Sequence, residues 1–425
     1  MGSSARDLAA AVDAPAARWA LFTVISAIFF LICGATFSSL GIILPFMIEE
    51  LSWTWSQAGT GFSLFALTVG LASTVPAWTL RRFGIKATYG IGGTVMVGGF
   101  SLLALTNGFH QYLLAAALLG LGFASCATVP AVHLLNGWMP EKRSAAIGAF
   151  MTIGGLGAVA GPLVANRAVA ATDSWRFYWW AAAVSLLALT ALALVFVKSP
   201  PNESRALDEG AARRAEQSSQ RVYRASSDWR FRDAIRTPQY WAIATAMTAT
   251  LLCVLTANSW AVTHLGTLGV SAALAAGMLS AGGAVSALSR ALGGALATRI
   301  DPKWLLVAAL AGEASGMAAL SVADNWIALF TFAAAEGFGF GMCFFATAIL
   351  LVNYFGPSDN PEIFGTFNLI TTAAMIGPAL GGFIADKFGG FAGLFQAYAV
   401  ALLAVVAVTA MMRPPGDRPD RHSTD

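Results

Sequence analysis

GGLGAVAGPLVANRAV, at Gly154–Val169, and TAAMIGPALGGFIAD, at Thr372–Asp386, are the two stretches of this chain that decide its fold. Each is an apolar run with a Gly-Pro pair in its middle and small residues on both sides. Small residues let helices approach closely, and proline removes a backbone hydrogen bond and permits bending. Matching pairs of this kind predict a duplicated helical protein of the membrane. The predicted helix-bending residues are Gly161, Pro162, Gly377 and Pro378.

The composition of the whole chain points the same way. Its 425 residues are 57% hydrophobic and 11% charged, whereas a soluble domain is about 45–50% apolar and about 25% charged. That balance excludes a soluble enzyme, a nucleic-acid binder and a disordered scaffold, because too little polar surface is available. The four cysteines have no CxxC spacing, and no catalytic cluster appears. We therefore expect no enzyme activity, no metal and no cofactor.

Twelve stretches are apolar over the roughly 20 residues that a membrane-spanning helix needs. They are 20–46, 57–80, 87–106, 112–137, 145–170, 177–197, 239–263, 272–298, 304–323, 327–353, 363–385 and 392–412. The fold class predicted is an all-α integral membrane protein with twelve transmembrane helices in two six-helix pseudo-symmetric halves.

The polar segments divide the chain into five parts. An N-tail (1–18) precedes the N-terminal half (19–197), a linker (198–238) joins it to the C-terminal half (239–412), and a C-tail (413–425) follows. The N-tail lacks a short apolar run ending in a cleavage site, so no removable signal peptide is expected. The linker mixes both charges without apolar periodicity, which predicts a solvated connector with a short surface helix near 229–235.

Lysine and arginine in the loops set the predicted orientation. If the N-terminus is cytoplasmic, 21 of the 25 lysines and arginines lie on the cytoplasmic side, whereas Arg167, Arg176 and Lys387 lie toward the opposite side and Arg290 lies inside a span. Cytoplasmic loops carry such an excess, so we expect an inner-membrane protein with both termini in the cytoplasm. The net charge of +3 is too small to imply a polyanion partner. The expected partner is the lipid bilayer, around a monomer.

Several stretches carry a family resemblance. They are GIILPFMIEELSWTWSQAG at Gly41–Gly59, NGWMPEKRSAAIGAF at Asn136–Phe150, SALSRALGGAL at Ser286–Leu296 and NYFGPSDNPEIFGTFNLI at Asn353–Ile370. With the loop after the second span, they make the chain resemble the major facilitator superfamily over nearly everything but the linker and tails. Within it, the chain looks most like the monocarboxylate and oxalate–formate exchange families.

The loop after the second span, WTLRRFGIK at Trp78–Lys86, carries the superfamily's loop pattern only in part. The usual pattern is Gly-x3-Asp-Arg-x-Gly-Arg-Lys, and Arg82, Gly84 and Lys86 fit it. The leading Gly and the Asp are replaced by Ala77 and Arg81. The resemblance therefore implies a gating loop here without its usual Asp-based bridge.

Arg290 lies near the middle of the eighth predicted span. An ionised side chain at that depth costs from about 2.5 to over 10 kcal/mol, so it usually faces an internal cavity and has a partner. The guanidinium presents a fork of donors that matches a carboxylate, and in the resembled families an arginine here contacts the transported anion. The alternative is a permanent structural ion pair.

Glu336, in the tenth span, is the candidate internal acid. Burial favours the protonated carboxyl, so a proton could come and go as exposure alternates. The alternative is that Glu336 caps or pairs near the outer end of its span. Monocarboxylate carriers often have an acid one turn before the arginine, but Ser286 stands there. Glu313, in the ninth span, is expected to pair locally.

These residues predict a secondary active transporter that moves a small organic monocarboxylate by alternating access, coupled to a proton or by exchange for a counter-anion. Arg290 would hold the carboxylate, Asn258, Asn368 and Tyr354 would hydrogen-bond to the substrate, and Glu336 would carry the proton. One cation without a second in the eleventh span favours a monoanion. The alternative is that Arg167 faces inward and supplies the second cation.

Alternatives remain open. One is a carrier or exporter of a larger organic acid, aromatic or peptide-like. Another is a multidrug exporter with an aromatic pocket that does not depend on a central cation. A membrane enzyme and a non-transporting receptor are the alternatives from other classes.

Overall fold

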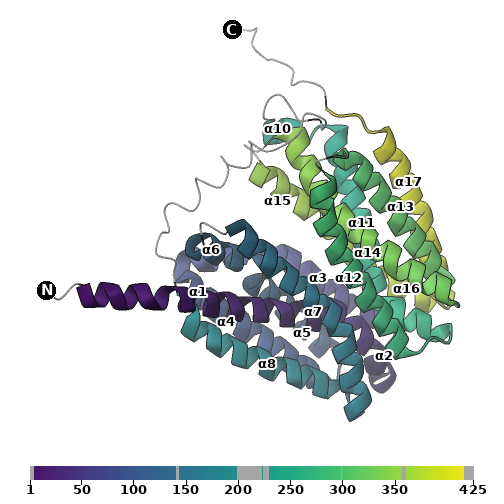
Figure 1. Cartoon of the computed structure of the whole chain (residues 1–425). Helices are drawn as coiled ribbons and strands as arrows, with labels where there is room; N and C mark the ends of the chain where they lie inside the picture. The colour runs from purple at the N-terminus through teal and green to yellow at the C-terminus, as the bar shows by residue number, and fades with distance from the viewer. Residues whose placement is uncertain are drawn as a thin grey trace, which may run out of the picture. The chain divides into compact units, whose positions relative to one another are not determined.

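The computed structural model describes residues 4–139, 143–198, 223, 229–297, 299–356 and 360–415. Within these ranges the chain is helical and contains no strand, which confirms the all-α prediction (Figure 1). Contacts divide it into two compact units. Unit 1 is Met1–Trp53 with Leu64–Ala212, and unit 2 is Thr54–Ser63 with Arg213–Asp425. Most of the predicted linker and the end of the C-tail lie outside the described residues.

Unit 1 is built from membrane-length helices and short irregular turns. Its elements are α1 (Ser4–Cys33), a π-helical turn η1 (Gly34–Ser38), α2 (Leu40–Leu51), the second half of α3 (Trp55–Leu71), a 3₁₀ turn η2 (Ala72–Thr74), α4 (Val75–Ala104), α5 (Phe109–Cys126), α6 (Thr128–Trp138), α7 (Arg143–Thr172) and α8 (Trp175–Phe196). The largest packing pairs here are α4 with α5, α4 with α8 and α1 with α7.

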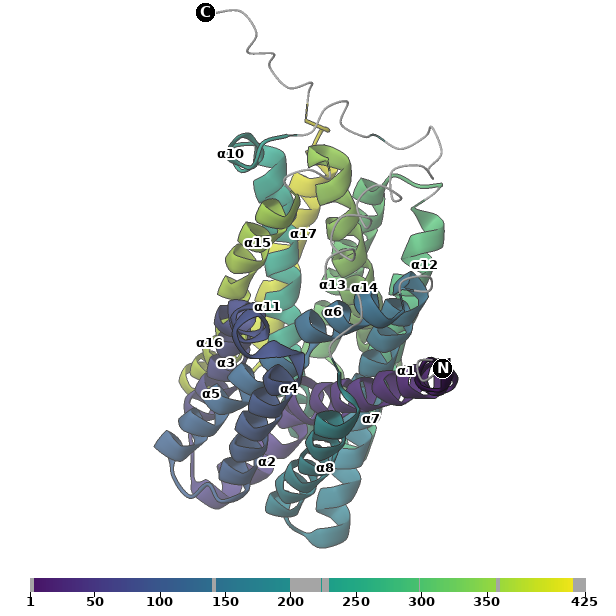
Figure 2. The same cartoon turned by 90° about the vertical axis from the view of Figure 1, so that its left-hand side faces the viewer.

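Unit 2 consists of the first turns of α3 and all helices after α8. These are α10 (Phe231–Ala234), α11 (Pro238–Thr267), α12 (Ala272–Leu296), α13 (Pro302–Ser321), α14 (Trp326–Phe355), α15 (Asn360–Thr371), a 3₁₀ turn η5 (Thr372–Ile376), α16 (Gly377–Phe388) and α17 (Ala392–Met411). The short helix α10 confirms the one expected near 229–235. α14 lies against both α12 and α13 (Figure 2).

Four helices of unit 2 begin at a side-chain cap. Thr237, Ser271, Asp301 and Asn325 each accept a hydrogen bond from a backbone N–H in the first turn of α11, α12, α13 and α14, respectively. Such caps satisfy donors that have no partner inside the helix. Proline follows at the first helical position of α11 and α13, where its missing N–H costs nothing.

Eleven stretches of the described chain are long and apolar enough to cross a bilayer. One of them, Trp55–Ala104, has 50 residues, which as one straight helix would be about 75 Å long. The hydrocarbon core is only about 30 Å thick. Gly84 breaks this run at φ 81° and ψ 171°, a conformation essentially restricted to glycine. The described chain therefore holds the twelve crossings that the sequence predicts.

The two Gly-Pro pairs occupy different helical settings. Pro162 lies inside α7, which continues as one helix, and Gly161 packs backbone to backbone on Gly34 of η1. Pro378 instead follows the 3₁₀ turn η5 at the start of α16. Its carbonyl accepts a 2.8 Å hydrogen bond from the indole of Trp260.

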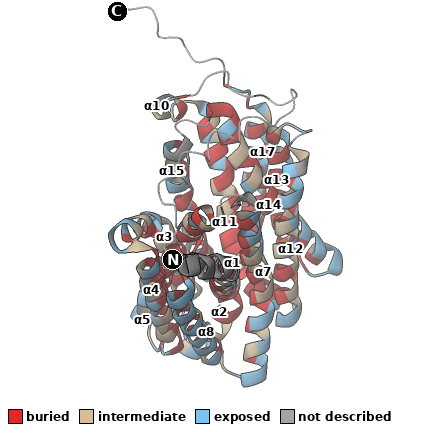
Figure 3. Cartoon of the chain, turned by 60° about the vertical axis from the view of Figure 1, so that its left-hand side comes forward, coloured by how far each residue is buried: buried red, intermediate tan, exposed pale blue. Residues whose placement is uncertain are grey.

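Exposed residues lie along the outward faces of the helices (Figure 3). Many of these residues are large and apolar. On α8, Val184 and Val195 are each 63% exposed, and on α12 Leu288 is 59% exposed. Soluble monomers rarely expose large contiguous apolar patches. These faces are therefore suited to lipid, as expected of an integral membrane protein.

Candidate transport site

Helices α12 and α14 meet along a seam of small residues within unit 2. A methyl group on Gly337 would overlap the backbone of Gly282, and one on Gly341 would overlap Ser286. Farther along, Gly293 lies against the ring of Phe345. Small residues allow such close approach in membrane helices. The seam fixes the register that places Arg290 of α12 beside α14.

Arg290 lies against two phenyl rings of α14. Its guanidinium carbon is 4.9 Å from the ring centroid of Phe340 and 4.8 Å from that of Phe344. These distances fall within the roughly 6 Å range of cation–π attraction. The two rings are one helical turn apart, so they share a face of α14. The side chain is half-buried, and a guanidinium presents a planar fork of N–H donors whose geometry matches a carboxylate.

Glu336 lies on the same seam, nearer than Arg290 to the N-terminal end of α12. It is 8% exposed, and its Oε2 would be 3.2 Å from a methyl group on Gly282. Gly282 precedes Arg290 by two helical turns, which is about 12 Å along the helix axis. The structure therefore separates Glu336 from Arg290 along α12 and does not join them as an ion pair.

The other predicted substrate-binding residues come from three further places in unit 2. Asn258 is half-buried on α11, and Asn368 is exposed on α15. Tyr354, 1% exposed, lies under Tyr223 with ring centroids 5.6 Å apart. Tyr354 is nearly three turns beyond Phe344 on α14, about 15 Å along the axis. It therefore lies at a different level from Arg290.

The gating-loop residues lie around Gly84, where the helical run Trp55–Ala104 is broken. Arg82 and Lys86 are exposed on either side of Gly84. An added methyl group on Gly84 would meet open space, so only the backbone conformation requires glycine there.

The prediction that Glu313 pairs locally was wrong. This residue of α13 was expected to pair locally, but it is 0% exposed and neither carboxyl oxygen has a hydrogen-bond partner in the described chain. Its Oε2 lies against Gly339 of α14, one turn after Glu336. The sequence alone gives no register between α13 and α14, so it could not bring these two acids to one interface.

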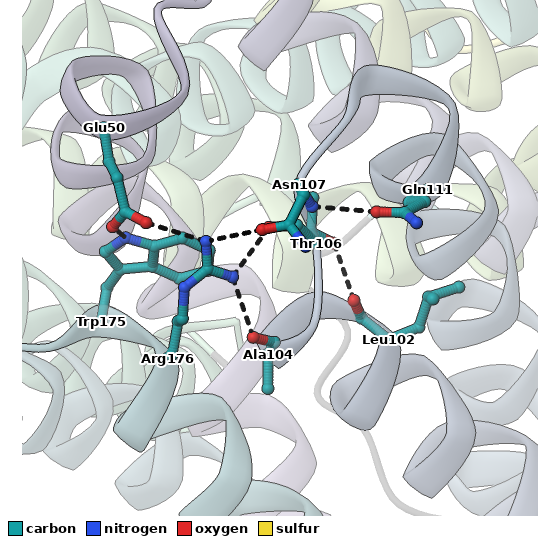
Figure 4. Close-up of polar contacts among 8 residues, drawn as sticks. All are labelled: Glu50, Leu102, Ala104, Thr106, Asn107, Gln111, Trp175 and Arg176. Carbon is teal, nitrogen blue, oxygen red and sulfur yellow. Dashed lines mark hydrogen bonds and ion pairs between the residues drawn. The ribbon is translucent and has the colours of Figure 1, made fainter.

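A polar cluster that sequence reasoning missed joins the ends of three helices of unit 1 (Figure 4). Arg176 of α8 forms a 2.8 Å ion pair with Glu50 of α2 and donates to the carbonyl oxygens of Ala104 and Thr106. The indole of Trp175 also donates to Glu50. Burial raises the pKa of the Glu50 carboxyl, but the hydrogen bonds from Arg176 and Trp175 and the Arg176 charge outweigh it, so the pKa lies below its usual value.

A second missed residue is Asp386 of α16. Its two carboxyl oxygens accept hydrogen bonds from the backbone N–H groups of Trp55 (3.1 Å) and Ser56 (2.8 Å), at the start of α3. A carboxylate at a helix N-terminus is stabilised by the helix dipole. Asp386 therefore caps α3 from a helix more than 300 residues away in sequence.

Helices of membrane length in two compact units, with an arginine held inside one span, define an integral membrane protein of the carrier type. A family model described as Major Facilitator Superfamily matches residues 26–303 and 284–425. The chain belongs to this superfamily, which confirms the resemblance drawn from the sequence.

Individual relatives are transporters. The chain is 28% identical over 412 residues to the hexuronate transporter of Bacillus subtilis (strain 168), covering 89% of this chain and 90% of that protein. It is 25% identical over 389 residues to the oxalate:formate antiporter of Oxalobacter formigenes, covering 82% and 84%, respectively.

Solved structures share the fold. An inward-facing, unoccupied structure of a bacterial homolog of the human lysosomal transporter Spinster superposes with a TM-score of 0.69 at 16% identity, covering 93% of this chain and 95% of that chain. Its occupied inward-facing form gives a TM-score of 0.67 at 18% identity, covering 92% and 94%, respectively.

Proposed function

We propose that this chain is a secondary active transporter of organic monocarboxylates, with Arg290 as the residue that binds the carboxylate. One observation carries the proposal: a cation is kept inside an apolar span, against the Phe340 and Phe344 rings. The energetic cost of placing arginine at this depth makes it a functional residue by default. Its planar fork is the side-chain group that best matches a carboxylate.

The names of the relatives support an acidic substrate. Hexuronate, oxalate and formate all carry a carboxylate, and the two relatives match most of this chain. A single arginine binds one carboxylate, so the first candidate is a small monocarboxylate. The hexuronate relative favours a second candidate, a larger hydroxylated monocarboxylate. In the proposal, the amides of Asn258 and Asn368 and the Tyr354 hydroxyl supply hydrogen bonds to the substrate.

The proposed coupling is to a proton, carried by Glu336, or to a counter-anion moved in the opposite direction. A carboxyl in an apolar environment exchanges a proton as its exposure changes. We propose that both termini face the cytoplasm, since the loop cations gather on that side. The test is thiol labelling of a cysteine introduced at Thr424, in right-side-out vesicles. A cytoplasmic C-terminus should be protected from a reagent that does not cross the membrane, and labelling by that reagent would contradict the proposed orientation.

The test of the substrate class is uptake into proteoliposomes. Labelled formate, lactate, benzoate, oxalate and glucuronate are compared with and without an inward proton gradient. The variants are Arg290→Ala and Arg290→Lys. Arg299→Ala is the matched control, because Arg299 is an exposed arginine just beyond the end of α12.

We expect uptake of at least one monocarboxylate, lost in Arg290→Ala, partly kept in Arg290→Lys and unchanged in Arg299→Ala. Lysine keeps the charge but not the two-point fork. Full uptake by Arg290→Ala would refute the site. If none of the acids moves, the substrate class is wrong. A preference for oxalate would contradict the single-carboxylate argument.

A further inference from the structure

Helices α13 and α14 cross in antiparallel fashion through two reciprocal glutamate–glycine contacts. A methyl group on Gly316, one turn after Glu313, would lie 2.8 Å from the backbone nitrogen of Glu336. A methyl group on Gly339, one turn after Glu336, would lie 2.5 Å from Oε2 of Glu313. Each acid therefore faces the other's glycine, and the two side chains are diagonal neighbours on one interface whose carboxyl groups interact electrostatically.

The pair lies inside unit 2 and has little access to water. Glu313 is 0% exposed and Glu336 is 8% exposed. Neither oxygen of Glu313 has a hydrogen-bond partner among the described side chains and backbone. Within the described ranges, neither Glu313 nor Glu336 forms an ion pair.

The titratable groups on the surrounding helices are two thiols, a tyrosine, a histidine and one arginine. α11 contributes the Cys253 thiol, and α14 contributes the Cys343 thiol, which accepts a 3.3 Å hydrogen bond from Thr250. On α17, the hydroxyl of Tyr398 is 3.4 Å from that of Thr256. On α12, Arg290 lies two turns away from the level of Glu336, against its phenyl rings. His264 of α11 is bound to the Leu320 carbonyl near the end of α13.

Two ionised carboxylates cannot share such a site. An unpaired charge in a low-dielectric interior is very costly, and a second like charge beside it adds repulsion. The groups nearby do not favour a metal cation, because the backbone carbonyls belong to intact helices and the thiols are poor ligands for hard ions. A proton is the ligand that removes the charge without needing further ligands.

We propose that Glu313 and Glu336 form a two-carboxyl site that binds one exchangeable proton. The proton moves between water and a carboxylate oxygen of Glu336, the acid with residual exposure and the one facing α12. Glu313, fully enclosed, stays protonated and neutral, so the exchangeable proton is the one on Glu336. The site itself does not need Arg290 or any substrate; its use in coupling rests on the proposed function.

The test detects protonated carboxyls directly in the purified full-length protein, reconstituted without substrate. Infrared spectra across a pH series record the carbonyl stretch of protonated acids. Labelling by dicyclohexylcarbodiimide, followed by peptide mass mapping, locates the reactive acid. The variants are Glu313→Gln, Glu336→Gln and the double change. Glu362→Gln is the control, since Glu362 is exposed on α15.

We expect a protonated-carboxyl band at neutral pH that is lost in the double variant, reduced in each single variant and unchanged in the control. In the wild type, the carbodiimide should label Glu336 and the label should decline as pH rises. An unchanged band in the double variant would overturn the proposal. So would displacement of the band by sodium at constant pH, because the pair would then be a metal-cation site.

The wild-type labelling pattern needs no variant to fold, so the inference stays testable if glutamine destabilises the protein. The readouts also separate this site from the transport assignment. Failure of the organic-anion proposal appears as full uptake in Arg290→Ala, whereas failure of the proton site appears in spectra taken without any anion. If both proposals hold, Glu336→Gln should lose gradient-driven accumulation and retain anion exchange.

Discussion

The two phenyl rings beside Arg290 offer a sharp test of how the candidate site works. The perturbation is the double variant Phe340→Leu/Phe344→Leu, which removes both rings and keeps apolar bulk. If the rings hold the guanidinium in place for a carboxylate, their loss should weaken substrate binding. Phe338→Leu is the matched control, because Phe338 is on the same helix but packs against Gly312 of α13.

The magnitude follows from the geometry of the contacts. Both centroid distances, 4.9 and 4.8 Å, lie well within cation–π range, and such contacts contribute about 0.5–1 kcal/mol at accessible sites and about 2 when desolvated. Phe344 is 47% exposed, which places these contacts at the lower end. The two rings together then contribute about 1–2 kcal/mol, which corresponds to a rise in KM of about 5- to 30-fold.

The assay is the concentration dependence of monocarboxylate uptake in proteoliposomes. We expect a higher KM with a much smaller change in maximal rate, because the rings position the group that binds the substrate. In an Arg290→Lys background, the ring substitutions should have less effect, as a double-mutant cycle would show. An unchanged KM in the double variant, or an equal rise in Phe338→Leu, would refute the reasoning.

Three further predictions concern stability, each measured as a thermal unfolding midpoint in detergent. The hydrogen bonds and ion pair with Arg176 and Trp175 hold the pKa of Glu50 below its usual value of 4.5. The free energy by which this contact stabilises the fold is therefore present above pH 4.5 and is lost as pH falls through the lower pKa of the folded state. Glu50→Gln should remove this pH-dependent contribution, which is at most about 1 kcal/mol for so exposed a pair. In Gly337→Ala the added methyl group would overlap the α12 backbone at Gly282, so the protein should be destabilised by about 1–3 kcal/mol. The control Gly294→Ala, whose methyl group meets open space, should not be destabilised. Equal unfolding midpoints for the two variants would contradict the close contact of α12 and α14. Asp386→Ala removes the cap of α3 and should cost about 0.5–2 kcal/mol, and no loss would mean that water replaces the carboxylate.

The membrane-spanning pattern could be predicted because it depends on local composition. Runs of about 20 apolar residues indicate spans whatever their neighbours are, and the twelve predicted stretches correspond to the described helices. The break at Gly84 was also visible, since Arg82, Gly84 and Lys86 interrupt an apolar run. What composition could not show was that α3, η2 and α4 form a nearly continuous helical run up to that glycine.

The candidate site was predictable only as single residues. Arg290 stands out because a charge within a span is rare, but its ring partners depend on how α12 and α14 are aligned. A chain of many phenylalanines gives no signal for which two face one arginine. The same ignorance of register led to the wrong expectation for Glu313. Its true neighbour, Glu336, lies on the next helix and faces it across two glycines.

Capping contacts between distant segments were the least predictable. Asp386 was read as the end of a small-residue span, and its role at the start of α3 depends on tertiary packing. The cluster around Arg176 was read only as a positive charge outside the membrane. In both cases the residue type suggests a polar contact, but the contacts include backbone groups, which the sequence does not distinguish from one position to the next.

The conformation of Gly84 has a consequence for how the whole chain is threaded. The turn makes two crossings out of a run that would otherwise make one. Without it, the number of passages before α5 would change from three to two, that is, from odd to even. Every later helix would then enter the bilayer from the opposite face, against the distribution of loop charges. A single backbone angle thus sets the parity of the entire topology.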